Sequence, residues 1–253
     1  MATVVELSAP YENHLLPILG ATSGVCAVCH TFVTGGWDRC YQCNEAARDL
    51  RATADAAGFV GLAVKGEQLA RDLWVYKSSA PEAARRPTRF GLAAVLWRWL
   101  ETHESCVADD ANVDDFSVVS TVPSTTGRSN HPLNDIVGSL IDPTARRYRT
   151  LLRPSPWTGG DRDFSEDRFE VVEPTDGEPV LLIDDTYTTG SRVQSAVAAL
   201  KEGGAGPVGV VCLGRHFNRH PQGDMYREAA EEYYRKAKRL GWSWDECCLC
   251  GNR

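Results

Sequence analysis

The chain has 253 residues, of which 43% are hydrophobic and 24% are charged, the ordinary balance of a globular protein. Its length suits one medium α/β domain with a small appendage, or two small domains. The formal net charge of −7 argues against a broad basic surface for duplex DNA, so a nucleic-acid partner is allowed but not indicated.

The N-terminal segment does not resemble a secretory signal. Residues 1–20 contain Glu6, Glu12 and two prolines, without a basic start followed by an apolar run. No stretch approaches the roughly 20 apolar residues of a membrane helix, because Arg98 interrupts the apolar segment 90–100. We therefore expect a cytoplasmic protein without a membrane partner, and the sequence leaves its oligomeric state open.

The predicted elements alternate between helices and strands. Periodicity predicts helices over residues 45–57, 68–76, 89–103, 133–140, 191–202 and 226–240. Apolar runs predict strands over residues 59–64, 116–122, 148–152, 169–172, 179–183 and 208–213. Polar loops are predicted over 107–115 and 153–168. This alternation predicts an α/β fold with a doubly wound parallel sheet, whose ligand lies beyond the carboxyl ends of the strands.

The composition changes at three places along the chain. The predicted segments are a poorly structured lead-in over 1–20, a cysteine-rich knuckle over 21–44, an α/β domain over 45–225, and a C-terminal helix with a cysteine-rich tail over 226–253. Most of the nine cysteines lie in the knuckle and the tail. In a reducing compartment, closely spaced cysteine pairs are more often metal ligands than disulfides.

The knuckle has the spacing of a tetrahedral zinc site. Cys26 and Cys29 form one C-x-x-C turn, and Cys40 and Cys43 form a second one ten residues later. Each turn directs two thiolates to one point, so that two turns complete a closed, structural site. Buried thiols or a redox-active pair are the alternatives.

The tail repeats part of this pattern. The motif W-D-x-C-x-x-C occurs at 37–43 and again at 244–250. Cys247 and Cys250 can form half of a second metal site, replace one of the N-terminal pairs, or bind a partner subunit, and the sequence does not rank these options. Cys106 and Cys212 are interpreted as plain core thiols.

The most specific pattern is the segment 180–192, which reads V-L-L-I-D-D-T-Y-T-T-G-S-R. An apolar strand leads into Asp184 and Asp185, whose carboxylates can accept hydrogen bonds from the diol of a ribose. The turn that follows offers backbone N–H groups and hydroxyls at the start of a helix, which favours an anion. Acids beside an anion cradle suit a sugar that bears a diol and a 5′-phosphate. The alternative is a plain strand–turn–helix junction, with Asp185 or Thr189 capping the helix.

A second hydroxyl-rich turn follows the strand predicted over 116–122. The segment 118–128 reads V-V-S-T-V-P-S-T-T-G-R. Backbone amides around residues 124–127 and the guanidinium of Arg128 suit a phosphate group, although an ordinary surface turn has the same composition.

The loop predicted over 153–168 is long for a compact domain. Such a loop is typical of a lid that excludes water from a reaction, or of a solvated linker. As a lid, it would place arginines near the bound ligand. The candidates are Arg153, Arg162 and Arg168.

The segment 180–192 resembles the signature of type I phosphoribosyltransferases, which binds phosphoribosyl pyrophosphate (PRPP). The resemblance implies that Asp184 and Asp185 bind the ribose hydroxyls. The other implied contacts to PRPP are Thr186, Thr188, Thr189, Gly190 and Ser191 in this segment, and Ser124, Thr125, Thr126 and Gly127 in the turn before it. The resemblance implies that this earlier turn holds the pyrophosphate, and that a closed lid brings its arginines near the leaving pyrophosphate. It further implies that a nucleobase-like or amine acceptor displaces pyrophosphate from ribose C1, that Mg²⁺ accompanies the pyrophosphate, and that Arg128 and Arg153 assist the two acids in catalysis.

A four-cysteine knuckle before a PRPP-type domain resembles the ComF-like competence family. This resemblance implies, as an alternative, a non-catalytic protein that binds PRPP or a nucleotide and acts in nucleic-acid handling or DNA uptake. A third hypothesis is a zinc-knuckle interaction protein whose α/β domain is only a scaffold. The acidic pair with the intact Thr-Thr-Gly turn argues against that third hypothesis. His131 and His216 are interpreted as structural or surface residues.

Overall fold

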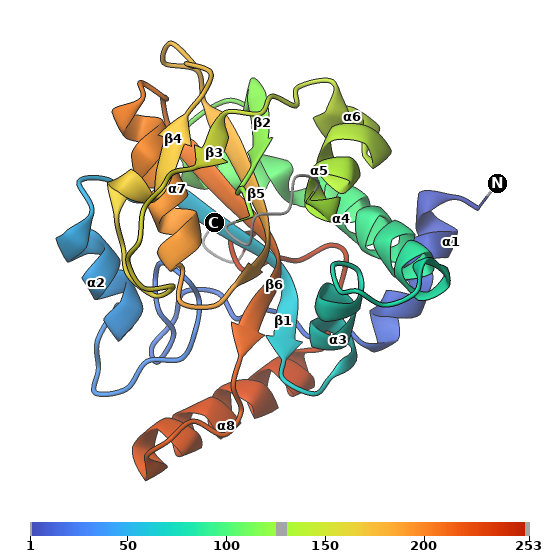
Figure 1. Ribbon diagram of the computed structural model, residues 1–253. Coiled ribbons are helices and arrows are strands. Elements are labelled where there is room, and N and C mark those ends of the chain that lie inside the picture. The colour runs from blue at the N-terminus through green and yellow to red at the C-terminus, as the bar shows by residue number, and fades with distance from the viewer. Residues whose placement is uncertain (1, 125–130, 251–253) are drawn as a thin grey trace.

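Four parallel strands form the central sheet of the computed structural model, which describes residues 2–124 and 131–250 (Figure 1). Their order in the sheet is β1–β6–β5–β2. The strands are β1 (Ala56–Val64), β2 (Val118–Thr121), β5 (Val180–Tyr187) and β6 (Val208–Phe217). A separate antiparallel hairpin joins β3 (Leu152–Pro154) to β4 (Phe169–Val171). The predicted α/β class with a parallel sheet is thus confirmed.

Helical segments occupy most of the connections between the strands. The longer ones are α2 (Tyr41–Asp49), α3 (Gln68–Val75), α4 (Glu82–Asp110), α7 (Ser191–Glu202) and α8 (Asp224–Leu240). The shorter ones are α1 (Val4–Ser8), η1 (Ala9–Asn13), α5 (Pro132–Asp135), η2 (Ile136–Leu140), α6 (Asp142–Ala145) and η3 (Glu166–Arg168). No helix within these described ranges has the length and apolar content that crossing a membrane requires.

Helices and the knuckle cover the two faces of the sheet. On one face, any side chain added at Gly58 of β1 would come within 2.8 Å of the ring of Trp99 in α4. The next residue, Phe59, points to the opposite face, where its ring meets Tyr187 and His30 edge-on. Helix α4 therefore covers one face, and the knuckle covers the other together with α7 (Figure 1).

The lead-in is more ordered than its composition suggested. Residues 4–13 are helical, and α1 begins with a capping box in which Thr3 and Glu6 exchange side-chain and backbone hydrogen bonds. The prediction of a poorly structured segment is wrong here, because a short helix of this kind shows too little periodicity to be recognised.

Two predicted helices have different lengths in the structure. The helix predicted over 45–57 is α2, which ends at Asp49, and by Ala56 the chain has entered β1 beside β6. The helix predicted over 89–103 is confirmed as part of α4 but continues to Asp110, into the segment predicted as a loop. Tertiary pairing and packing override local composition in both cases.

One continuous apolar core joins the predicted segments. Cys26 and Cys29 of the knuckle and Cys248 of the tail belong to the same cluster of buried side chains as the strands of the sheet. The knuckle and the tail are therefore packed onto the α/β unit and share its core.

Candidate functional site

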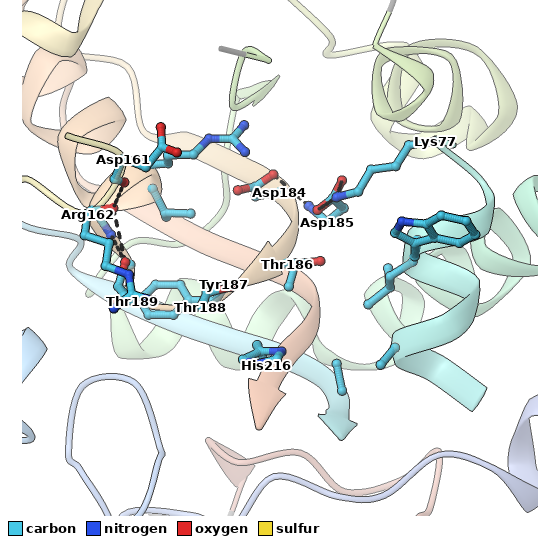
Figure 2. A pocket seen from close by; sticks show the side chains of 18 residues that line it. Lys77, Asp161, Arg162, Asp184, Asp185, Thr186, Tyr187, Thr188, Thr189 and His216 are labelled. Atoms are coloured by element: carbon cyan, nitrogen blue, oxygen red, sulfur yellow. Dashed lines mark hydrogen bonds and ion pairs between the residues drawn. The ribbon is translucent and has the colours of Figure 1, made fainter. Parts of the chain in front are cut away.

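A pocket of about 480 Å³ lies where β5 turns into α7 (Figure 2). Its wall combines the end of β5 and the turn with side chains from α3, the end of β6 and the loop 153–168. The lining residues are Ala63, Ala70, Leu73, Trp74, Lys77, Asp161, Arg162, Asp184, Asp185, Thr186, Tyr187, Thr188, Thr189, Gly190, Ser191, Arg192, Val193 and His216. All seven PRPP contacts that the sequence predicted in the segment 180–192 thus lie in one pocket wall.

The turn from β5 into α7 requires glycine at its last position. Gly190 has a φ of +86°, a left-handed conformation that glycine adopts without strain. A Cβ atom at this position would also collide with the hydroxyl of Tyr187, which is buried under the turn. Gln194 of α7 donates a hydrogen bond to that hydroxyl at 3.3 Å, so the turn and the helix are held together.

The turn presents hydrogen-bond donors to the pocket. The N–H groups of Thr188, Thr189 and Gly190 have no acceptor among the described residues. The N–H of Ser191 donates to Thr189 Oγ1 at 3.3 Å, which orients that side chain at the start of the helix. Free amides at a helix N-terminus form a positive site for an anion.

The acidic pair lies in the pocket wall toward Lys77, away from Thr188 and Thr189 (Figure 2). Asp184 is 2% exposed and Asp185 is 3% exposed, so each carboxylate has a narrow opening to the pocket. Asp184 Oδ1 accepts a hydrogen bond from the N–H of Asp185 at 2.8 Å, which leaves Oδ2 as its remaining acceptor.

Asp185 is held by three side chains from other elements. Lys77 Nζ lies 2.8 Å from each carboxylate oxygen, and the hydroxyl of Tyr76 donates to Oδ2 at 2.5 Å. His131 Nε2 lies 3.8 Å from Oδ2. Because a carboxylate has about four acceptor positions, the Oδ1 side can still accept one more hydrogen bond.

The two acids differ in their electrostatics. Burial raises the pKa of Asp184 to about 6; the Arg192 guanidinium opposes that shift, whereas the Asp185 carboxylate adds to it. Burial also penalises the charged form of Asp185, but the ammonium of Lys77 and the hydrogen bonds from Lys77 and Tyr76 outweigh it. The pKa of Asp185 therefore lies below its usual range. Asp185 is an anchored carboxylate, and Asp184 is the acid that titrates closest to neutral pH.

The loop 153–168, interpreted as a lid or a solvated linker, contacts the turn directly. Ser191 Oγ donates to the backbone carbonyl of Asp161 at 2.9 Å. Asp161 and Arg162 line the pocket beside Thr189 (Figure 2). The loop therefore forms one side of the pocket in this structure.

The three arginines of this loop have different surroundings. Arg162 lines the pocket. Arg168 is 2% exposed and donates to the carbonyl oxygen of Asp161 at 3.1 Å, so it holds the loop itself. Arg153 is not among the described residues of the pocket wall; it lies on the β3–β4 hairpin, 65% exposed, and pairs with Glu170 at 2.5 Å. Of the three, the structure thus places only Arg162 in the pocket wall, on the side of the turn.

The turn predicted to hold pyrophosphate follows β2, the neighbour of β5 in the sheet. Arg192 Nη2 donates to the carbonyl oxygen of Pro123 at 3.1 Å, so the two turns lie side by side. Of the predicted contacts, only Ser124 lies within the described residues. Thr125, Thr126, Gly127 and Arg128 lie outside them.

Several residues of the site were not identified from the sequence. Tyr76 and Lys77 directly follow α3, and His131, interpreted as a structural or surface residue, precedes α5. His216, interpreted likewise, lines the pocket, and burial lowers its pKa. Their positions after predicted strands or next to predicted helices were the available signal, but the order of the strands was needed to place them together.

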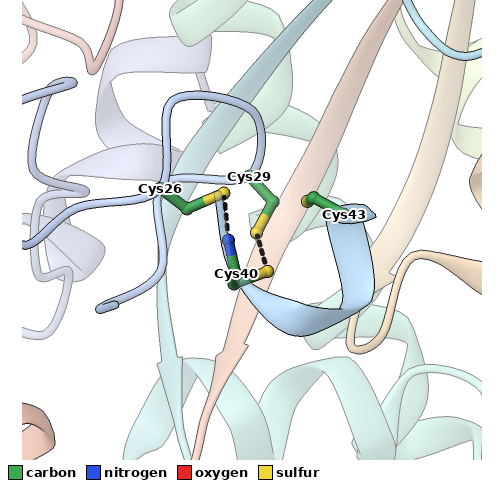
Figure 3. Close-up of side chains that lie close together, drawn as sticks. All are labelled: Cys26, Cys29, Cys40 and Cys43. Atoms are coloured by element: carbon green, nitrogen blue, oxygen red, sulfur yellow. Dashed lines mark hydrogen bonds between the residues drawn. The ribbon is translucent and has the colours of Figure 1, made fainter. Parts of the chain in front are cut away.

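The four cysteines of the knuckle converge (Figure 3). We call Cys26, Cys29, Cys40 and Cys43 the knuckle cluster; their four sulfurs lie within 4.8 Å of one another. Cys29 Sγ and Cys40 Sγ are 3.6 Å apart, and the N–H of Cys40 donates to Cys26 Sγ at 3.3 Å. A tetrahedron of thiolates about 2.3 Å from zinc separates its sulfurs by about 3.8 Å. The knuckle cluster therefore fits a structural zinc ion.

Arg215 connects the knuckle to the pocket. This arginine of β6 is 5% exposed and donates to the carbonyl oxygen of Cys29 at 2.9 Å and to Cys29 Sγ at 3.3 Å. The same guanidinium donates to the carbonyl oxygens of Tyr187 and Thr188 at 3.1 and 2.9 Å. One side chain thus joins a sulfur of the knuckle cluster to the backbone of the turn.

A scan against protein-family models gave no match to this chain, and a search of curated proteins gave none either.

Proposed function

We propose that this chain binds PRPP with Mg²⁺ in the pocket at the end of β5, as a ComF-like member of the type I phosphoribosyltransferases with the corresponding fold. The observation that carries the proposal is that an acidic pair and a turn of free amides line the same pocket of about 480 Å³. Few ligands match both features, because one end of the ligand must donate hydrogen bonds to carboxylates and its other end must be an anion.

The turn suits the 5′-phosphate. Thr188, Thr189 and Gly190 supply amides at the N-terminus of α7 that have no other acceptor in the described chain, while the hydroxyl of Ser191 donates to the backbone of the adjacent loop at Asp161. A phosphate here would accept several hydrogen bonds and lie at the positive end of the α7 dipole. Arg162, on the adjacent loop, adds a cation to this end of the pocket.

The acidic pair suits the ribose hydroxyls. Asp184 Oδ2 and the open side of Asp185 Oδ1 can each accept a hydrogen bond. A ribose diol has two hydroxyls that can donate to such carboxylate oxygens. Lys77 and Tyr76 hold Asp185 in place before the ligand binds, and such preorganisation lowers the entropy lost on binding.

The pyrophosphate lies, in this proposal, beside the Arg192 side chain, close to Pro123 at the end of the described segment after β2. Transfer forms a bond from an acceptor nitrogen to ribose C1 and breaks the bond from C1 to the pyrophosphate oxygen. The bonding electrons leave with pyrophosphate, and the acceptor loses its proton to solvent. The protein contributes position and charge stabilisation, and Mg²⁺ bound with the pyrophosphate would supply further neutralisation of the leaving group's charge. Trp74, 66% exposed at the pocket wall, offers an aromatic face to a nucleobase-like acceptor.

A second candidate is binding of PRPP or a nucleotide without transfer. The observation that favours it is the paired state of Asp185, whose two oxygens are both bridged by Lys77. Release of pyrophosphate in the presence of candidate acceptors separates the two: a binding protein saturates with PRPP and releases none.

Calorimetric titration with PRPP and Mg²⁺ tests the proposal. We expect the double variant Asp184→Asn/Asp185→Asn to lose at least ~100-fold in affinity, because hydrogen bonds to charged groups contribute about 1.5–3 kcal/mol each. PRPP is strongly anionic, so removal of two negative charges that did not touch it would raise its affinity. An unchanged or higher affinity in a folded double variant contradicts the ribose contacts.

Asp161→Asn is the matched control. Its carboxylate is fully exposed at the same pocket, and only its backbone carbonyl contacts the turn. We expect this variant to bind PRPP as well as the unmodified chain or slightly better.

A further inference from the structure

The tail forms a second cluster of metal-ligating side chains with α4. His103 and Cys106 lie one turn apart on α4, and Cys247 and Cys250 follow α8 near the end of the described chain. We call these four residues the tail cluster. One ligand atom from each lies within 4.8 Å of the others, as in the knuckle cluster.

The hydrogen bonds of His103 leave one ring nitrogen facing the sulfurs. His103 Nε2 lies 2.9 Å from the carbonyl oxygen of Trp244, which can only accept, so Nε2 carries the proton. Nδ1 is then a lone-pair donor, and it lies 3.5 Å from Cys250 Sγ and 3.8 Å from Cys106 Sγ. Histidine ligands of metals are commonly fixed in this way, through a carbonyl at the other ring nitrogen.

The sulfurs are spaced for a shared ion. Cys106 Sγ and Cys247 Sγ lie 3.4 and 3.2 Å from Cys250 Sγ, far beyond the roughly 2.05 Å of a disulfide. The N–H of Leu249 donates to Cys247 Sγ at 3.4 Å, as the N–H of Cys40 does to Cys26 in the knuckle. Backbone donors of this kind stabilise thiolates, the form in which cysteine binds metal.

We propose that His103, Cys106, Cys247 and Cys250 bind a second structural zinc ion. Three thiolates and an imidazole nitrogen are a ligand set of structural zinc, and four protein ligands leave no open position for a substrate. The ion fastens the tail to α4 across 144 residues of sequence. This site is independent of the PRPP proposal, because none of its ligands lines the pocket at β5.

Other contacts place the tail where the ion requires it. The ring of Trp244 lies 4.0 Å from the guanidinium carbon of Arg98 in α4, and its indole N–H donates to Glu12 of the lead-in at 2.5 Å. The lead-in, α4 and the tail are therefore assembled around the cluster.

Metal analysis of the purified chain tests the proposal. We expect two zinc ions per chain in the unmodified protein and one in Cys106→Ala/Cys250→Ala. The matched control is Cys248→Ala, a buried cysteine between two ligands that is not one of the four; this variant retains both ions. One zinc per chain in the unmodified protein, or two in the double variant, overturns the proposal, as does a disulfide among these cysteines.

X-ray absorption at the zinc edge decides the question if the double variant fails to fold. Two occupied clusters in the unmodified chain supply seven sulfurs and one nitrogen to two ions. We expect a zinc coordination shell that contains sulfur and nitrogen in this ratio of seven to one. A coordination shell of sulfur alone rules out His103 as a ligand and overturns the proposed site.

Discussion

The knuckle cluster and the tail cluster contact different parts of the molecule. The knuckle cluster lies behind the turn from β5 to α7 and touches it through Arg215. The tail cluster lies on α4 and touches the lead-in through Trp244. The two clusters therefore have different expected roles, although their ligands are similar. The knuckle cluster supports the pocket, and the tail cluster holds the tail against α4.

The largest effect is expected from loss of the knuckle cluster. In Cys26→Ala/Cys29→Ala we expect residues 21–44 to unfold, because structural zinc contributes about 10–16 kcal/mol to the folding of small zinc domains. The turn then loses its support, and PRPP affinity falls at least ~100-fold. Zinc content, circular dichroism and calorimetry measure the three consequences. Unchanged PRPP binding in this variant would contradict the claim that the knuckle cluster supports the pocket.

Loss of the tail cluster should affect stability without affecting the ligand. For Cys106→Ala/Cys250→Ala we expect the free energy of unfolding to fall by about 2–5 kcal/mol, the range for large defects at buried sites. PRPP affinity should stay within about twofold, since the cluster does not reach the pocket. Denaturant unfolding measures the loss of stability, and calorimetry on the same preparation measures PRPP affinity. A large loss of affinity argues against separate roles for the two clusters.

Arg215 sharpens the comparison, because it can be changed without replacing a metal ligand, although its guanidinium donates to Cys29 Sγ. Arg215→Gln removes hydrogen-bond donors from the carbonyl oxygens of Tyr187, Thr188 and Cys29. Each buried acceptor left without a donor costs about 1–3 kcal/mol of folding free energy. We expect zinc content to be kept while PRPP affinity falls about tenfold. Loss of zinc together with affinity would show that Arg215 acts on the knuckle alone.

The pH dependence of stability should reveal Asp184. Its pKa is raised in the folded chain, so its contribution to stability is complete below its usual pKa and is lost as the pH rises through about 6. Asp184→Asn should therefore be more stable than the unmodified chain at pH 7–8, by up to about 3 kcal/mol, with a difference that shrinks toward pH 5. Thermal unfolding at saturating zinc measures this, and a less stable variant at pH 8 contradicts it.

The smallest effect is expected at Arg153. Its pair with Glu170 is 65% and 40% exposed, and such pairs contribute about 0–1 kcal/mol. Arg153→Gln should leave PRPP affinity and any transfer rate within about twofold. A rate loss above tenfold would return Arg153 to the role that the family resemblance implies, through a movement of the β3–β4 hairpin.

Local patterns in the sequence were sufficient for much of the fold and one site. The strand before Asp184, the turn at Gly190 and the helix over 191–202 were all readable, because each depends on neighbouring residues. The same holds for the C-x-x-C turns of the knuckle, whose four ligands span only 18 residues.

The remaining features depend on residues that are distant in sequence. Lys77 meets Asp185 only because α3 and β5 end at the same edge of the sheet, and no local pattern reports the strand order β1–β6–β5–β2. Cys106 was interpreted as a core thiol for the same reason, since its partner Cys250 lies 144 residues away.

The sequence by itself thus determined the α/β class, the glycine turn after β5 and the knuckle, which are encoded by hydrophobic periodicity, glycine and close cysteine spacing. The tertiary structure alone decided the partners of the acidic pair, the link through Arg215 and the assembly of the tail cluster. The physical reason is that contacts between distant segments are selected by the packing of the whole core, a property that no short stretch of chain carries.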